Sequence, residues 1–188
     1  YVGKGMSGGE IVVRPKQEES FVWKDNIIVG NTCLYGATGG HFFAAGCAGE
    51  RFGVRNSGAV AVIEGLGDHA CEYMTGGLIV SLGKTGTNFG AGMSGGLAFI
   101  YDEDDSFGNL FNPAMIGIER LGESAEIDAL KKVIEAHAAN TESPHAKALL
   151  DDWGTTVSKF WKAAPHPATP ETPKSYLKLE TLKIPVHA

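Results

Sequence analysis

Several glycine-rich segments of the sequence fit a pattern that binds dinucleotides in other proteins. Gly65-Leu66-Gly67-Asp68-His69-Ala70 fits the G-x-G-x-x-G/A fingerprint, in which a pyrophosphate rests on a helix N-terminus. Gly3 to Gly8 and Gly90 to Gly95 fit it too, but both lead into strand-like segments. Only 18 residues separate Gly65 from Gly83, which leaves little room for a crossover helix. The pattern therefore favours a glycine-rich corner over a nucleotide site.

Two further segments show incomplete ligand-binding patterns. Gly83-Lys84-Thr85 is similar to the end of a phosphate-binding P-loop, but Leu78 stands where the leading glycine is required. The acidic run Asp102 to Asp105 hints at a calcium loop, yet Phe107 occupies its glycine position and Pro113 its bidentate carboxylate position. We expect Lys84 to be a solvated corner residue and the acidic run to be a charged exit from a strand.

Cysteine and histidine residues show no spacing typical of a metal or catalytic site. Cys33, Cys47 and Cys71 form no C-x-x-C pair and have no histidine at metal-ligand spacing, so we expect free thiols that act as small buried hydrophobes. His41 and His69 lack a neighbouring nucleophile and acid. No paired carboxylates stand out. The sequence therefore predicts no catalytic, cofactor-binding or metal-binding residue.

A repeat of 18 to 19 residues organises the first hundred positions. Hydroxyl-glycine pairs precede each apolar segment, with the hydroxyl residues at Ser7, Thr38, Ser57, Thr75 and Ser94. The longer first gap holds the polar stretch 15–25, which we interpret as an inserted loop. A unit this short cannot form a propeller blade or a strand-helix-strand crossover, but it suits one turn of a β-solenoid.

Stacked solenoid coils would align equivalent side chains. Five residues past each hydroxyl the sequence has a large apolar residue, namely Val12, Phe43, Val62, Val80 and Phe99. We expect these to form one continuous internal column. At about 4.8 Å per coil, residues 26–100 would give a rod of roughly 20 Å, with glycines at the corners where a Cβ would be penalised.

A helical pattern replaces the repeat in the second half. Apolar spacing predicts a helix over 121–137 with Ser124 as N-cap, and Ser143-Pro144 begins a second helix toward Trp153. That helix is expected to resume after Gly154 as far as Phe160 and Trp161. We expect three regions: a glycine-repeat β-helix over 1–112, helices packed on it or capping it over 113–164, and a Pro-rich extended tail over 165–188.

Composition places the chain among globular proteins of a reducing compartment. Its 188 residues are 43% apolar and 20% charged, with a net charge of −6 that argues against nucleic acid as a partner. Apolar runs are only a few residues long, which argues against a membrane segment. Three cysteines and no recognisable leader favour the cytoplasm. The start at Tyr1, without Met, suggests an excised domain.

The repeat blocks carry a family resemblance. The blocks and the helical region resemble the C-terminal glycine-repeat (GXGXG) domain of the glutamate synthase large (alpha) subunit over about 160 residues. The segments that carry this resemblance are Tyr1 to Pro15, Gly30 to Gly40, Gly49 to Gly58, Gly90 to Gly96, Glu119 to Trp153, and Lys159-Phe160.

The resemblance implies an all-β solenoid, a right-handed parallel β-helix of stacked coils with C-terminal α-helices, that acts as a scaffold. The parent enzyme makes two glutamates from glutamine and 2-oxoglutarate, with reducing equivalents from NADPH or ferredoxin. Its amidotransferase domain and its synthase domain, which carries FMN and an iron–sulfur cluster, are the implied partners within the same polypeptide. A small flavoprotein subunit is a further implied partner. None of the family's catalytic or cofactor residues maps onto this chain.

Two other functions remain open from the residues. One is a dinucleotide-binding oxidoreductase domain centred on Gly65 and Gly67. The other is a stand-alone β-helix enzyme acting on polysaccharide, for which the charged residues available are Glu50, Arg51, Arg55, Glu64 and Asp68. The first coil, Tyr1 to Gly9, would expose unpaired strand groups, so we also expect it to need a cap, a neighbouring domain or self-association.

Overall fold

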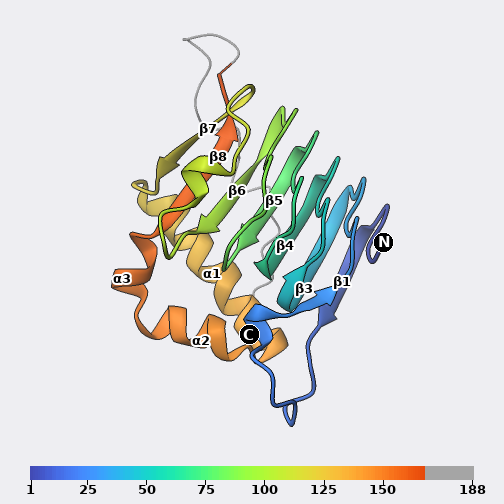
Figure 1. The fold of residues 1–188 in the computed structure, drawn as a ribbon, viewed down its shortest axis with the longest axis vertical. Coiled ribbons are helices and arrows are strands. Elements are labelled where there is room, and N and C mark those ends of the chain that lie inside the picture. The colour runs from blue at the N-terminus through green and yellow to red at the C-terminus, as the bar shows by residue number, and fades with distance from the viewer. Residues whose placement is uncertain (168–188) are drawn as a thin grey trace.

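The computed structural model describes residues 1–167, in which a stack of strands is flanked by three helices (Figure 1). The helices are α1 (Ser124–Thr141), α2 (Pro144–Asp151) and α3 (Trp153–Val157), with short 3-10 turns η1 (Trp23–Asp25) and η2 (Phe107–Asn109). The strands are β1 (Ser7–Val13), β2 (Ile27–Val29), β3 (Gly39–Ala48), β4 (Ser57–Gly65), β5 (Thr75–Ser81), β6 (Gly95–Tyr101), β7 (Ile116–Arg120) and β8 (Phe160–Pro165).

Five of these strands repeat once per coil and confirm the expected solenoid. β1, β3, β4, β5 and β6 lie parallel, each paired with the next, in a β-solenoid of about four turns. The strand order of the sheet is β1-β3-β4-β5-β6-β8-β7, and β2 pairs separately with β3. Figure 1 shows the rungs side by side from β1 to β6. The repeat of 18 to 19 residues therefore corresponds to one coil.

The predicted apolar column exists, but it does not lie inside the solenoid. Val12, Phe43, Val62, Val80 and Phe99 pair in one register across the five strands. The last four pack outside the coils, against residues of α1 and α2, and Val12 is 40% exposed. The prediction of an internal column was wrong by one residue in phase. Because both faces of these strands are buried, alternation in the sequence could not tell one face from the other.

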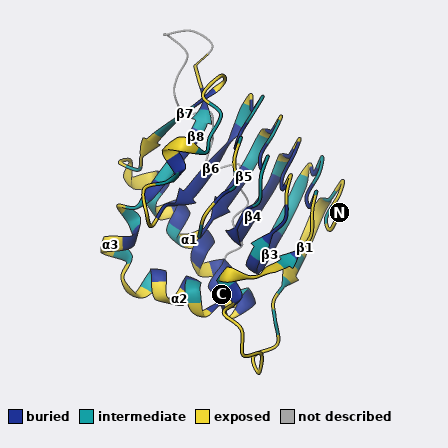
Figure 2. Cartoon of the chain, in the orientation of Figure 1, coloured by how far each residue is buried: buried dark blue, intermediate teal, exposed yellow. Residues whose placement is uncertain are grey.

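The neighbouring file of side chains fills the solenoid interior. It consists of Ile11, Phe42, Ala61, Ile79 and Ala98, one residue before each member of the outer column. Facing it from the corners are buried Phe52, Met74 and Phe89. Figure 2 shows this burial running through the stacked strands and under the helices. The sheet is thus the shared wall of two separate cores.

Each coil turns its long corner through alternate residues with left-handed backbone. In the corner before β3, Thr32, Leu34 and Gly36 have φ of 63°, 57° and 64°. Their N–H groups donate alternately to neighbouring coils: Thr32 to Glu50 O at 2.8 Å and Leu34 to Val2 O at 2.9 Å. The G-x-G pairs at Gly3 and Gly90 occupy the equivalent corner positions. Glycine is therefore favoured at these corners because residues with a Cβ adopt the left-handed conformation only at a cost in free energy.

The C-terminal strands differ from the sequence prediction. Phe160 and Trp161 lie in β8, not in a helix, and β8 pairs antiparallel with both β6 and β7. Pairing covers the edge that β6 would otherwise expose, and the Trp161 indole N–H donates to Asp102 at 2.9 Å. Tertiary pairing therefore overrode the local helical pattern.

The two expected helix starts are close to those observed. α1 begins at Ser124 itself, and Glu123 occupies the capping position, one residue earlier than predicted. α2 starts at Ser143-Pro144 as expected, with Pro144 in the first turn, and Ser143 Oγ caps it by accepting a hydrogen bond from Ala146 N at 3.0 Å. α1 and α2 cover the outer column of the sheet through Leu130, Val133 and other apolar residues.

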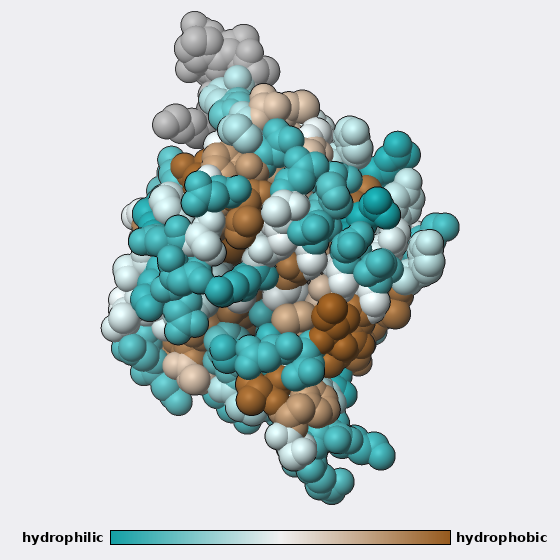
Figure 3. Space-filling view, in the orientation of Figure 1, coloured by the Kyte–Doolittle hydropathy of each residue, from teal (hydrophilic) through white to brown (hydrophobic). Residues whose placement is uncertain are grey.

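The face of the molecule seen in Figure 3 is mostly hydrophilic, with apolar side chains gathered over β2 and the segment before it. Within residues 1–167, no helix combines the length and apolarity needed to cross a bilayer. The Pro-rich tail predicted for 165–188 lies, from residue 168 onward, outside the described residues.

Candidate functional site

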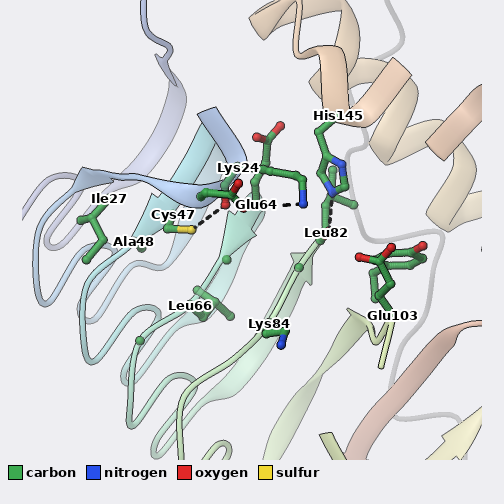
Figure 4. A pocket seen from close by; sticks show the side chains of 15 residues that line it. Lys24, Ile27, Cys47, Ala48, Glu64, Leu66, Leu82, Lys84, Glu103 and His145 are labelled. Atoms are coloured by element: carbon green, nitrogen blue, oxygen red, sulfur yellow. Dashed lines mark hydrogen bonds and ion pairs between the residues drawn. The ribbon is translucent and has the colours of Figure 1, made fainter. Parts of the chain in front are cut away.

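A cleft of about 390 Å³ lies where the strands end, between the coils and α2. The segment around η1 and the start of α2 stand over it, as Figure 4 shows for Lys24 and His145. Its lining comprises Lys24, Asp25, Ile27, Cys47, Ala48, Glu64, Gly65, Leu66, Gly67, Leu82, Gly83, Lys84, Tyr101, Glu103 and His145.

Strand register brings residues from successive coils to this cleft. Ile27 of β2 pairs with Cys47 of β3, and Cys47 pairs with Gly65 of β4. A Cβ on Gly65 would lie 2.5 Å from Cys47 Sγ, so glycine is required there for coil packing. His145 Nε2 donates to Leu82 O at 2.7 Å and ties α2 to the next coil. The cleft is therefore an elongated hollow across the stack.

Gly65 and Gly67 do not form a dinucleotide site of the expected kind. β4 ends at Gly65, residues 68–73 form a turn, and β5 begins at Thr75. The fingerprint needs a helix N-terminus after its glycines to hold the pyrophosphate, and a strand follows instead. This geometry agrees with the solenoid-corner interpretation.

A buried carboxylate forms the polar centre beneath the helices. Glu64 Oε1 accepts a hydrogen bond from Ser143 Oγ and lies 3.2 Å from His137 Nε2. All three side chains are buried, and neither Glu64 Oε2 nor His137 Nδ1 has a hydrogen-bond partner among the described residues. Burial lowers the pKa of His137, partly opposed by Glu64.

The order of these groups suits structure better than catalysis. A nucleophile triad places the imidazole between hydroxyl and carboxylate, whereas here Glu64 lies between Ser143 and His137. The cluster joins β4 to α1 and to the cap of α2. This cluster could not be predicted from the sequence, because 73 and 79 positions separate Glu64 from its partners and no local pattern signals such a contact.

Ion pairs neutralise the cations at the cleft rim. Lys84 Nζ lies 2.6 Å from Asp104 Oδ2, and this contact lowers the pKa of Asp104 to about 2. Lys24 Nζ lies 3.5 Å from Asp25 Oδ1. Glu103 has no ion pair with any of residues 1–167. The Glu103 end of the rim therefore carries two carboxylates, those of Glu103 and Asp104, near the Lys84 ammonium.

The acidic run around Asp102 forms the strand exit that the sequence predicted. Asp102 is buried, and its carboxylate accepts hydrogen bonds from Ser106 N at 3.0 Å and Phe107 N at 3.1 Å. These bonds close the turn between β6 and η2. Lys84, as expected, is an exposed corner residue.

The three cysteines are free thiols in different surroundings. Cys33 and Cys71 lie in the solenoid core, whereas Cys47 borders the cleft and donates from Sγ to Lys24 O at 3.0 Å. Burial, with help from Glu64, raises the pKa of Cys47 to about 11. Across residues 1–167, no three His, Cys, Asp or Glu side chains converge in a way that could hold a metal ion. An iron–sulfur cluster does not fit these thiols.

The charged residues considered for polysaccharide cleavage lie in two places. At the solenoid corners, Arg51 lies next to Asp68 of the following coil, and Arg51 N donates to Asp68 O at 2.8 Å. Arg51 and Arg55 are exposed at the corner before β4, and Asp68 Oδ1 accepts from Thr87 N at 2.7 Å in the next corner. Glu64 lies beneath the helices instead. His69 contacts Glu72 at 2.8 Å. Glu64 is therefore separate from the charged residues at the corners.

Comparison with known proteins assigns the coil architecture to a family. The GXGXG motif family matches residues 1–166. The chain belongs to this family. The glycines of the motif occupy corner positions that have a left-handed backbone. These glycines are Gly3, Gly5, Gly90 and Gly92.

Relatives in this family are large glutamate synthases. The chain is 54% identical to ferredoxin-dependent glutamate synthase 2 of Synechocystis over 175 residues. This match covers 93% of the chain and 11% of the Synechocystis protein. It is 51% identical over 183 residues to the Arabidopsis thaliana ferredoxin-dependent glutamate synthase 1, covering 96% and 11%. The NADPH glutamate synthase large chain of Azospirillum brasilense is 49% identical over 187 residues, covering 100% and 12%. The chain thus spans about a ninth of these relatives.

Proposed function

We propose that this chain is the structural and contact domain of a cytoplasmic glutamate synthase and carries no active site of its own. The supporting observation is its identity of about one half to glutamate synthases along almost the whole chain, although it spans only about a ninth of their length. The buried polar groups agree with this role, because Glu64 and Asp102 join elements of the fold.

The scaffold would hold two catalytic domains at a fixed separation. The amidotransferase domain releases ammonia from glutamine, and the synthase domain combines it with 2-oxoglutarate under reduction, giving two glutamates in total. Continuous backbone ladders through strands and corners make the coil stack stiff. A stiff spacer limits slippage between the domains, and slippage would open the ammonia route to water.

The cofactors and further partners belong to other parts of the parent protein in this proposal. FMN and an iron–sulfur cluster reside in the synthase domain, and a small flavoprotein subunit or ferredoxin supplies electrons. The outer edge of β1, which pairs only with β3 among the described strands, contacts neighbouring chain or a second copy.

The full-length gene product tests the proposal. We expect the open reading frame to extend well beyond these 188 residues and its product to form glutamate from glutamine and 2-oxoglutarate with NADPH or reduced ferredoxin. The 188-residue chain alone should form none. A complete reading frame of 188 residues, or a longer product without this activity, would overturn the proposal.

A further inference from the structure

An exposed apolar patch borders the cleft. Phe21, Val22 and Ile27 are 39%, 57% and 69% exposed and lie in or just before β2. Figure 3 shows brown side chains gathered over this part of the molecule. Ile27 also lines the cleft, so patch and hollow are continuous. Contiguous apolar surface beside a hollow is typical of a contact site.

The cleft is elongated along the coil stack. Strand register places Ile27, Cys47 and Gly65 side by side along its floor. On the next two coils the lining continues through Leu82 after β5 and Glu103 after β6, and these strands are paired in sequence. Four steps of about 4.8 Å make a path of roughly 19 Å. An extended peptide advances about 3.3 Å per residue, so roughly six residues would span it.

The two ends of this path differ in chemistry. The Ile27 end is apolar, with Leu66 and Ala48 beside it on the same floor (Figure 4). At the other end the Lys84 ammonium pairs with Asp104, and Glu103, which Lys84 also attracts, forms no direct ion pair within residues 1–167. The complementary occupant therefore carries an apolar side chain at one end and a cation at the other.

We propose that the cleft and the patch bind an extended segment of the parent polypeptide from outside these 188 residues. That segment places an apolar side chain over Ile27 and, about six residues away, a Lys or Arg side chain at Glu103. This inference rests on the proposed function. It commits to the parent polypeptide because about eight-ninths of the relatives' length lies outside this chain.

A second copy of the chain fits this surface less well. A two-fold contact presents the same patch on both copies, so one hollow would face another and the two Glu103 carboxylates would lie near the same interface. Neither hollow would be filled. A protruding segment of different sequence fills it and supplies the missing cation.

Thiol labelling in the longer protein tests the inference. Lys84→Cys places a thiol at the cleft rim, where the native side chain is 74% exposed, and Lys131→Cys is the control on the outer face of α1 at 44%. Both are made with Cys47→Ser, which preserves a donor to Lys24 O. Maleimide should label position 84 about tenfold more slowly in the longer protein than in the 188-residue chain, with position 131 within about twofold.

Substitutions at the two ends of the cleft test whether Ile27 and Glu103 contact the bound segment. Ile27→Asp and Glu103→Arg should each restore fast labelling at position 84 in the longer protein, whereas Asp128→Arg, exposed on α1, should not. Circular dichroism of the same variants in the 188-residue chain should show unchanged folding.

The outcomes separate the two proposals. An active glutamate synthase in which position 84 is labelled as fast as in the short chain overturns the docking inference and leaves the proposed function standing. An inactive longer protein overturns the proposed function. Protection of position 84 that grows with the concentration of the short chain identifies a second copy as the occupant and also overturns the inference.

Discussion

At the scale of single residues, Glu64 combines full burial with one carboxylate oxygen that has no partner among the described residues. Its other oxygen holds Ser143 and His137, so the side chain links the solenoid to the cap of α2. Removing it would leave two buried donors unpaired.

We therefore expect Glu64→Ala to lower the free energy of unfolding by about 2–4 kcal/mol. Glu64→Gln should cost less, because its amide oxygen can accept from the same two donors. Urea denaturation of the chain measures both, with Asp128→Ala, an exposed site on α1, as the control. Equal stability of Glu64→Ala and wild type would show that the cluster does not tie the helices down.

His137 gives stability a defined pH dependence. Burial lowers its pKa in the folded state, and nearby His145 acts in the same direction while Glu64 opposes it. The unfolded chain therefore binds the proton more readily, so stability is complete above the ordinary histidine pKa of about 6.5 and falls as pH drops below it.

We expect a loss of up to about 1.4 kcal/mol per pH unit from this residue below pH about 6.5. The measurement is the free energy of unfolding between pH 5 and 8 for wild type and His137→Gln. The difference between the two curves should shrink toward acid. A constant difference would mean that His137 has the same proton affinity in both states.

Cys47 should react slowly despite lying beside the cleft. With its pKa raised from 9.0 to about 11, its thiolate fraction near neutral pH is about a hundredfold below that of an ordinary thiol. Iodoacetamide labelling followed by mass spectrometry should give a rate that rises until pH about 11. The denatured chain, in which all three thiols react readily, is the control. A fast reaction at pH 7 would contradict the assigned environment.

At the scale of elements, the coils depend on glycine for two separable reasons. Gly36 and Gly77 both have positive φ, at 64° and 83°. A Cβ on Gly36 meets nothing within 4 Å, whereas one on Gly77 would lie 2.4 Å from Ala59 O in the adjacent strand. The first position needs only the conformation, and the second also needs the space.

Gly36→Ala should cost about 1 kcal/mol and Gly77→Ala at least about 3 kcal/mol. Thermal or urea unfolding of the two variants, matched in chemistry and in backbone region, gives the comparison. If both cost the same, close packing of the coils contributes little at Gly77.

The repeat unit was predictable from sequence because hydroxyl and glycine residues recur at fixed spacing and force the corners. The face of the strands was not, since Phe42 and Phe43 are both buried and alternation carried no phase information. β8 was missed because pairing with β6 decides its structure, and the local pattern around Phe160 and Trp161 favoured a helix.

The cleft could be predicted only in part. The sequence placed Gly65 and Lys84 at corners, which is where they lie, but the hollow itself arises from the insertion before β2 and from the position of α2. Contacts such as His145 with Leu82 join residues 63 positions apart. Such contacts follow from the docking of helices on the sheet, which no local signal in the chain encodes.

At the scale of the whole molecule, the sheet is one wall shared by a solenoid core and a helix-covered core. Loss of the wall would disrupt both cores at once, so the domain should unfold cooperatively and behave as a rigid spacer. This rigidity is the property that the proposed scaffold role requires.

Ammonia release by the full-length protein tests that role most directly. In wild type, glutamate formed per glutamine consumed should stay near two, with little free ammonia. Gly77→Ala, which introduces a clash between adjacent coils inside this domain, should increase free ammonia per glutamine hydrolysed and lower the glutamate yield, while Gly36→Ala stays close to wild type. Unchanged coupling in Gly77→Ala, despite a measured loss of domain stability, would contradict the account.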